Sequence, residues 1–347
     1  MPQLISIILP CRNEEKYIEK CIQSLINNQS TGFQLEIIII DGMSTDRTVE
    51  IINEYVRQFS FIKLLQNLDK TVPYAMNLGI AHAQGEIIVR VDAHALYPEN
   101  YISTLITNLI DLDADNVGAV WKTDVLIKNK KTLAIREVLS NRFGVGNALF
   151  RIGIEKVTQA DTVPFGCYKK SVFTRFGLYD TRLTRNQDIE LNKRIVQGGG
   201  KIYLLPNLEC VYYARETFSA IAKNNYNNGL WNILTVKYTN KMTSLSLRHF
   251  IPLCFILSLI LPLFLSFLYP PLLWIAVWSS SHYLGLLSII CTRLAIRKKL
   301  NFFYLLWSFM VLHFSYGVGS LIGIFKFPRD LSFVDNVPVQ KKNCTMK

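Results

Sequence analysis

From Phe250 to Phe325 this chain is nearly uncharged apart from one basic cluster, and this feature most limits what the chain can fold into. Phe250 to Tyr269 and Leu272 to Thr292 are apolar runs separated by Pro270-Pro271. Each has roughly the 20 residues that a helix needs to cross a hydrocarbon core. A third apolar run, Phe302 to Phe325, comes after a basic cluster. The sequence therefore predicts a membrane part over 246–326 with two or three transmembrane segments (250–269, 272–292, 302–325) and a tail over 327–347.

Basic residues set the expected orientation of these segments. Arg297, Lys298 and Lys299 lie between the second and third runs, and Arg248 precedes the first. By the positive-inside rule both positions face the cytosol, so the first two runs form a hairpin. The third run either crosses fully or is re-entrant or interfacial, because Lys326 after it also favours the cytosolic side; the sequence leaves this open. We expect a multi-pass protein of the inner (cytoplasmic) membrane with a cytosolic N-terminal domain.

Residues 1–245 have the pattern of a soluble α/β domain. Apolar runs predict buried strands at Ile5–Leu9, Glu36–Ile40, Phe61–Leu65 and Glu86–Val91, and the segments between them have helical spacing. Strands that alternate with helices in this way form a mostly parallel, doubly wound sheet. No G-x-G-x-x-G follows a strand, which argues against a dinucleotide-binding Rossmann site.

Polar groups follow three of these strands. Cys11–Glu15 follows the first, Asp41 ends the second, and Asp92 and His94 follow the fourth. In open α/β sheets, ligands bind outside the carboxyl ends of the strands. Asp92 and His94 are two residues apart, so in extended chain both side chains point the same way and suit a metal ion with its phosphates. The alternative is that Asp92 caps a helix and His94 is a polar loop residue. Asn13 is expected to cap the first helix.

The second half of the soluble part is less regular. Asp188 and Glu190 lie near the start of a predicted helix that ends at Gly198–Gly200. The simplest role of acids at this position is to complement the helix dipole and to cap the helix. The other predicted elements are strands at Val117–Trp121 and Val125–Ile127, a loop over Ser140–Gly153 and a long helix over Thr217–Tyr238.

Charge and cysteine content narrow the class of protein. The formal net charge is +12, but zinc-finger spacing, RNA-binding aromatic motifs and a basic helix with heptads are absent, so we expect no nucleic-acid partner. A basic surface also suits anionic membrane lipids and a diphosphate-bearing substrate. The seven cysteines form no C-x-x-C pair, which fits a reducing compartment. The N-terminal residues lack the features of a signal peptide.

Four ordered motifs run through the soluble part. They read P-C-R-N-E-E, I-I-I-I-D-G-M-S-T-D-R-T, A-M-N-L-G-I-A-H-A-Q-G-E-I-I-V-R-V-D-A-H and N-Q-D-I-E-L-N. The set resembles glycosyltransferase family 2 and is similar to the bacterial succinoglycan-biosynthesis type of glucosyltransferase, in which the metal motif is also D-A-H. The resemblance covers residues 4–240. It implies a GT-A-type doubly wound mixed sheet with one nucleotide-sugar half and one acceptor half.

The resemblance also implies roles for single residues. Asp41 matches the acid that binds the uracil base, Asp92 and His94 match the metal and diphosphate motif, and Asp188 matches the catalytic base that deprotonates the acceptor hydroxyl. The nucleotide-sugar site is expected to contain Pro10, Arg12, Glu14, Asp41 and Asp92.

The implied activity is a metal-dependent, inverting hexosyltransferase that uses Mn²⁺ or Mg²⁺. It would move a hexose, glucose being one option, from a UDP-sugar to a polyprenyl-diphosphate-linked saccharide in exopolysaccharide or cell-envelope glycan biosynthesis. Two alternatives stay open: a polyprenyl-phosphate glycosyltransferase, and a non-catalytic nucleotide-sugar-binding subunit of a polysaccharide assembly complex.

The chain departs from the family pattern at three places. His94 replaces the second acid of the usual D-x-D motif, so it touches either metal or phosphate, and Gln187 replaces the acid that usually precedes Asp188. The Q-x-x-R-W element of processive synthases is absent, which favours the addition of one sugar at a time.

Overall fold

A computed structural model describes residues 3–28 and 32–326. Within them the chain forms two compact units. The first contains the residues up to Ala119 together with Gln159–Leu208, and the second contains Val120–Thr158 and the described residues from Glu209 onward. In the described residues the chain passes from one unit to the other within three strands: β6 (Asn116–Asp124), β7 (Thr158–Gln159) and β9 (Ile202–Tyr213).

The first unit is built on a mixed sheet. Its parallel strands are β1 (Gln3–Cys11), β2 (Phe33–Asp41), β3 (Ile62–Gln66) and β4 (Ile87–Arg90), in the order β3-β2-β1-β4. Next to β4 lies β8 (Cys167–Lys169), which runs antiparallel to it. The sheet continues through β6 and β9 to the short β5 (Ala95–Leu96), and β7 (Thr158–Gln159) pairs with β9. The central side chains of β1 and β2 are buried on both faces, as their continuous apolar runs predict.

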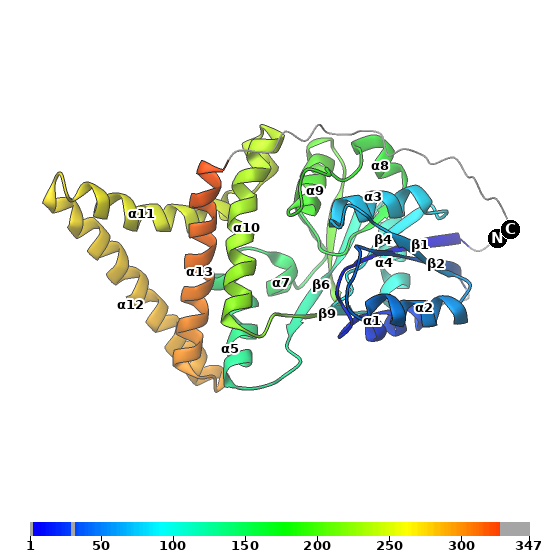
Figure 1. Cartoon of the computed structure of the whole chain (residues 1–347), viewed down its shortest axis with the longest axis horizontal. Coiled ribbons are helices and arrows are strands. Elements are labelled where there is room, and N and C mark those ends of the chain that lie inside the picture. The colour runs from blue at the N-terminus through cyan, green and yellow to red at the C-terminus, as the bar shows by residue number, and fades with distance from the viewer. Residues whose placement is uncertain (1–2, 29–31, 327–347) are drawn as a thin grey trace. The chain divides into compact units, whose positions relative to one another are not determined.

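Helices cover both faces of the parallel strands. Figure 1 shows α1 (Ile18–Ile26) and α2 (Thr48–Gln58) on one face and α3 (Val72–His82) on the other. This follows from right-handed crossovers, because the chain moves outward from β1 to β3 and then back to β4. The unit also contains α4 (Tyr101–Asp111), α8 (Ser171–Phe176) and α9 (Gln187–Gln197).

Three local predictions were wrong. Asn13 does not cap the first helix: α1 begins at Ile18, and Asn13 has a left-handed φ of 56° with its side chain turned to another loop. Val125–Ile127 is not a strand, since β6 ends at Asp124 and the Ile127 amide donates to Glu216 at 2.7 Å instead of to a neighbouring strand. The expected loop over Ser140–Gly153 contains two one-turn helices, α6 (Arg142–Val145) and α7 (Leu149–Ile152).

The second unit is mainly helical. Three of its segments are long and apolar enough to cross a membrane: Leu247–Leu265, Pro270–Lys298 and Phe302–Phe325. The second of these runs six residues beyond the predicted end at Thr292, into the basic cluster. The helices are α5 (Lys130–Leu139), α10 (Phe218–Thr239), α11 (Ile251–Leu265), α12 (Leu273–Lys298) and α13 (Phe302–Phe325), with the 3₁₀ turns η1 (Met242–Ser244), η2 (Leu247–Phe250) and η3 (Pro270–Leu272).

Candidate active site

The loops that follow β1 and β2 are joined to each other by hydrogen bonds. The Asn13 amide donates to the Ser44 hydroxyl at 2.8 Å, and the Asn13 side-chain oxygen accepts from the Thr45 amide at 2.8 Å. The Glu14 amide donates to the Thr48 hydroxyl, also at 2.8 Å. Several polar side chains of the first two motifs therefore bind each other's loops and fix the conformation of one edge of the sheet.

Asp41 lies at this edge and is almost fully buried. Both of its carboxylate oxygens accept from Ser44, one from the amide at 2.9 Å and one from the hydroxyl at 2.5 Å. Beside it, Gly42 packs against the Arg12 side chain, which a Cβ at Gly42 would approach to 3.3 Å. Pro10 pairs with Ile40 in the adjoining strands. Asp41 thus fixes the turn after β2, and its recognition of a uracil base stays a prediction.

The main chain at Asp92 is held in place by two side chains. Its amide donates to the Tyr97 hydroxyl at 2.8 Å, and its carbonyl accepts from that hydroxyl at 3.2 Å. The Cys21 thiol donates to the same carbonyl at 3.6 Å. Burial, with the charge of Asp92, raises the pKa of Cys21 well above its usual range, so it stays a protonated donor. Asp92 therefore projects its carboxylate from a rigid segment.

Glu14 and His94 face each other across the edge. Nδ1 of His94 lies 3.2 Å from Oε1 of Glu14, and both side chains are partly exposed. A carboxylate at Nδ1 fixes the orientation of an imidazole and, in the neutral ring, leaves Nε2 as the nitrogen without a proton. Such a nitrogen coordinates a metal ion better than it contacts a phosphate oxygen. The sequence interpretation placed Glu14 near the nucleotide but did not anticipate this pair.

Arg90 is the site residue that the sequence interpretation missed. Its buried guanidinium lies 3.4 Å from Asp92 through Nη2 and 3.6 Å from Asp188 through Nη1. Burial alone would lower the pKa of Arg90, but the two carboxylates raise it, so the group stays charged. One buried cation therefore joins the expected metal ligand to the expected base. The available signal was an arginine inside an otherwise apolar strand.

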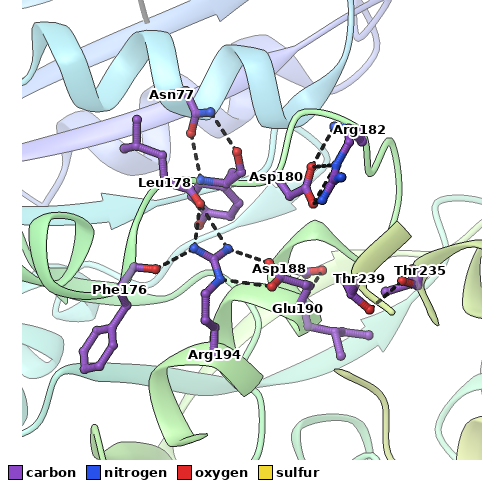
Figure 2. Close-up of polar contacts among 12 residues, drawn as sticks. Asn77, Phe176, Leu178, Asp180, Arg182, Asp188, Glu190, Arg194, Thr235 and Thr239 are labelled. Carbon is purple, nitrogen blue, oxygen red and sulfur yellow. Dashed lines mark hydrogen bonds and ion pairs between the residues drawn. The ribbon is translucent and has the colours of Figure 1, made fainter. Parts of the chain in front are cut away.

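Asp188 and Glu190, both in the first turn of α9, have different surroundings. Figure 2 shows that Arg194 forms a two-pronged ion pair with Glu190, at 3.0 and 2.5 Å. The same guanidinium donates to the carbonyl oxygens of Phe176 and Leu178. Through Arg194, Glu190 therefore holds α9 against the preceding loop. Asp188 keeps a third of its side chain exposed, as a group that meets a substrate must.

The loop before α9 is anchored to α3. Asn77 binds the Tyr179 main chain on both sides: its amide nitrogen donates to the carbonyl at 2.9 Å, and its oxygen accepts from the amide at 3.0 Å (Figure 2). Arg182 closes the loop through a bidentate pair with Asp180. These contacts fix where α9 begins, and with it the position of Asp188.

Asp92 and His94 lie on a turn and not in extended chain as predicted, since the Ala95 amide donates to the Asp92 carbonyl oxygen at 3.3 Å. Their joint binding of a divalent cation stays a prediction. Asp92 and His94 supply a carboxylate and an imidazole, which together favour manganese over magnesium. Among residues 3–28 and 32–326, no group of three or more His, Cys, Asp or Glu side chains is placed to hold a metal ion. A cation here would take its remaining ligands from phosphate oxygens and water, as such ions commonly do with nucleotides.

Comparison with known proteins identifies the family. The model of glycosyl transferase family 2 matches residues 6–180, which contain both edge loops, Arg90, Asp92 and His94. The chain belongs to this family. A dolichyl N-acetyl-alpha-D-glucosaminyl phosphate 3-beta-D-2,3-diacetamido-2,3-dideoxy-beta-D-glucuronosyltransferase of Methanococcus voltae is 30% identical over 230 residues, 65% of this chain and 71% of the relative. The succinoglycan biosynthesis protein ExoA of Rhizobium meliloti is 28% identical over 211 residues, 60% and 63% of the two chains.

A solved structure confirms the fold. The mannosyltransferase PcManGT from Pyrobaculum calidifontis, in complex with GDP-Man and Mn²⁺, aligns with a TM-score of 0.58 at 17% identity. The alignment covers 92% of this chain and 88% of that one. This family 2 glycosyltransferase therefore has the predicted GT-A-type mixed sheet, followed by long apolar helices.

Proposed function

We propose that this glycosyltransferase is membrane-anchored and inverting, and that it moves a hexose from a UDP-sugar to a polyprenyl-diphosphate-linked saccharide. The observation that carries the proposal is the chain of contacts from Asp92 through Arg90 to Asp188. It links a carboxylate suited to a metal–diphosphate group with a partly exposed carboxylate suited to act as a base. A subunit that only bound nucleotide sugars would have no use for the second carboxylate.

The chemistry follows from these positions. Asp188 accepts the proton of the acceptor hydroxyl while the hydroxyl oxygen bonds to the anomeric carbon and the diphosphate leaves with the bonding electrons, which inverts that carbon. A positioned general base of this kind contributes about 10²–10⁴-fold. Arg90 lies between the carboxylates of Asp188 and Asp92 and keeps both in position. A divalent cation held by Asp92 and His94 would supply neutralisation of the charge on the leaving diphosphate.

A lipid-linked acceptor and a membrane location are supported by two observations. The Methanococcus voltae relative carries a dolichyl-linked sugar phosphate in its name, and the second unit has segments long enough to span a bilayer. We propose a cytosolic catalytic domain over 1–245, a membrane part over 246–326 and a tail over 327–347, in the cytoplasmic membrane. The net charge of +12 would favour both an anionic leaflet and a diphosphate group.

The test is UDP release by the detergent-purified full chain. UDP-glucose, UDP-galactose and UDP-N-acetylglucosamine would be offered with Mn²⁺, Mg²⁺ or EDTA, with and without a lipid extract of the source cells. We expect metal-dependent release with one donor, increased by the extract. Asp188→Asn should reduce turnover about 10²-fold or more while donor binding is kept. The matched control is Asp111→Asn on α4, distant in sequence from every motif.

The outcomes separate the alternatives. Increased release with polyprenyl phosphate that carries no sugar would favour the polyprenyl-phosphate glycosyltransferase. Donor binding without release under any condition would favour a binding subunit. Near-normal turnover in Asp188→Asn would show that Asp188 is not the base.

A further inference from the structure

α13 is packed against α10 at unusually close range. A Cβ on Gly229 of α10 would collide with the Tyr316 carbonyl oxygen of α13, and one on Gly319 of α13 would collide with the Tyr226 carbonyl oxygen of α10. Glycines at a helix crossing let two backbones touch. The two helices are therefore in backbone contact near the middle of both.

The contact extends to both ends of α13. Near its first turn, the Tyr304 ring stacks with Phe218 of α10 at a centroid distance of 6.4 Å. Near its last turn, Lys237 of α10 donates to the carbonyl oxygens of Gly323 and Lys326, at 3.0 and 2.8 Å. The helices thus run side by side and in the same direction over the full length of α13, as Figure 1 shows.

α10 is too polar to enter a bilayer. It carries Lys223 and Lys237, and charged side chains inside the hydrocarbon core of a membrane are unfavourable. It also carries five asparagines: Asn224, Asn225, Asn227, Asn228 and Asn232. If α13 crossed the membrane, the helix in contact with it throughout would have to cross as well.

The other two apolar helices have different surroundings. Of the most apolar window of α13, 39% is buried inside the protein, against 11% and 17% for the segments that contain α11 and α12. Figure 1 shows α11 and α12 leaving the α10–α13 pair at a steep angle and meeting at a distant tip. If α11 and α12 form a hairpin that crosses the bilayer with its tip on the far side, α13 lies across the end of the hairpin opposite the tip.

The face of α13 turned away from α10 carries an apolar stripe that is exposed towards both ends of the helix. Phe303, Trp307, Val318, Ile322 and Phe325 are 38–75% exposed. Their spacing of three and four residues places them on one side of the helix. Between the two exposed parts, Phe314 packs against Phe255 of α11 and Tyr283 of α12. An exposed apolar helical face with an aromatic residue suits the boundary between headgroups and acyl chains.

We propose that α13 is not a third transmembrane segment but lies in the cytosolic membrane interface, with this stripe against lipid. Only α11 and α12 cross, so both ends of α13 face the cytosol, which also agrees with the positive charge of Lys326. The inference rests on the proposal that α11 and α12 span a membrane and does not depend on the sugar or the acceptor.

The test is cysteine labelling in intact cells with a membrane-impermeant maleimide. The background would be Cys254→Ser/Cys344→Ser, in which the five remaining cysteines are buried. Single cysteines would replace Phe267 at the hairpin tip, Arg297 at the end of α12 and Lys326 after α13; all three residues are exposed.

We expect labelling of Phe267→Cys in intact cells, and of Arg297→Cys and Lys326→Cys only after permeabilisation. Labelling of Lys326→Cys in intact cells would show that α13 crosses and would overturn the inference. If Phe267→Cys and Arg297→Cys were labelled from the same side, the hairpin itself would be wrong and the inference would fail with it. UDP release is not read in this experiment, so failure of the enzymatic proposal is separable.

A second measurement reads the depth of α13. Phe303→Cys and Val318→Cys would carry a fluorescent label in vesicles of phosphatidylethanolamine and phosphatidylglycerol that contain shallow or deep nitroxide lipids. An interfacial helix gives stronger quenching by the shallow lipid at both positions. Stronger quenching by the deep lipid at Val318 alone would indicate a spanning helix.

Discussion

At the scale of single residues, the candidate site depends on one arginine between two carboxylates. Arg90→Met removes the cation and leaves Asp92 and Asp188 close together without compensation. We expect the kcat of the folded enzyme to fall about 10²-fold or more, because Asp188 loses the group that positions it as a general base. UDP release per folded protein at saturating donor measures this change.

A purely structural role of Arg90 would lower the amount of folded protein without changing the kcat of the protein that does fold. The matched variant is Arg182→Met, which breaks the ion pair with Asp180 in the loop before α9. It should lower stability and leave the kcat of the folded protein nearly unchanged.

The pair of Glu14 and His94 gives a second prediction at this scale. Glu14→Gln keeps the shape of the side chain but weakens the contact that orients the imidazole. Loss of such an orienting carboxylate typically costs about 10–100-fold in metal affinity. We therefore expect the Mn²⁺ concentration for half-maximal UDP release to rise by that factor with little change at saturating Mn²⁺. Glu19→Gln, on the exposed side of α1, serves as the control. An unchanged Mn²⁺ requirement would contradict the metal role of His94.

At the scale of elements, a buried acid ties the central strands together. Glu36 on β2 accepts from the Ser6 hydroxyl and the Gln84 amide, both at 2.6 Å, and from Lys63 on β3 at 3.1 Å. Burial would raise the pKa of Glu36, but these donors outweigh it and lower the pKa. The carboxylate therefore stabilises the fold above its unfolded pKa of about 4.3, and this contribution is lost as pH falls through the lower folded value.

Glu36→Gln should consequently lower the melting temperature of the detergent-solubilised protein at pH 7, by an amount equivalent to about 1–3 kcal/mol. The difference between variant and parent should narrow as the pH is lowered below 4. Glu54→Gln on the exposed part of α2 is the control. If the difference in melting temperature between variant and parent stayed constant with pH, ionised Glu36 would not be what stabilises these strands.

The contact between α10 and α13 gives a prediction from two glycines. Gly229→Ala places a methyl group against the backbone of α13, and overpacking of this kind costs about 1–3 kcal/mol. Gly285→Ala in α12 meets no atom within 4 Å and should be neutral or stabilising by up to about 1 kcal/mol. Thermal unfolding of both variants measures the difference. Equal melting temperatures would show that the close contact is not maintained.

At the scale of the whole molecule, the proposed topology of two crossing helices and one interfacial helix predicts an integral membrane protein. We expect the full chain to stay in the membrane pellet after extraction with alkaline carbonate, which removes peripheral proteins. Lys298→Ala breaks the bidentate pair with Glu137 on α5 but leaves the apolar segments intact, so it should not release the protein. Recovery of the parent protein in the supernatant would contradict the spanning hairpin.

The sequence by itself determined the four parallel strands, the order of the motifs and the family. β1, β2 and β4 are buried on both faces and therefore appear as continuous apolar runs, such as Glu36–Ile40 in β2. Because parallel strands end at one edge, Asp41, Asp92 and His94 could be assigned to that edge before any coordinates. The apolar C-terminal runs could also be recognised from the sequence, because candidate membrane helices are identified by length and composition.

Only the tertiary structure decided which side chains meet. Arg90 joins Asp92 to Asp188 although 96 residues separate the two acids, and no local pattern encodes such a contact. The same is true of α13, whose composition fits a transmembrane helix. Its contact with polar α10, far away in sequence, is what favours an interfacial position. The composition of a segment shows which environments its own side chains are compatible with. The segments packed against it determine which of these environments it can occupy.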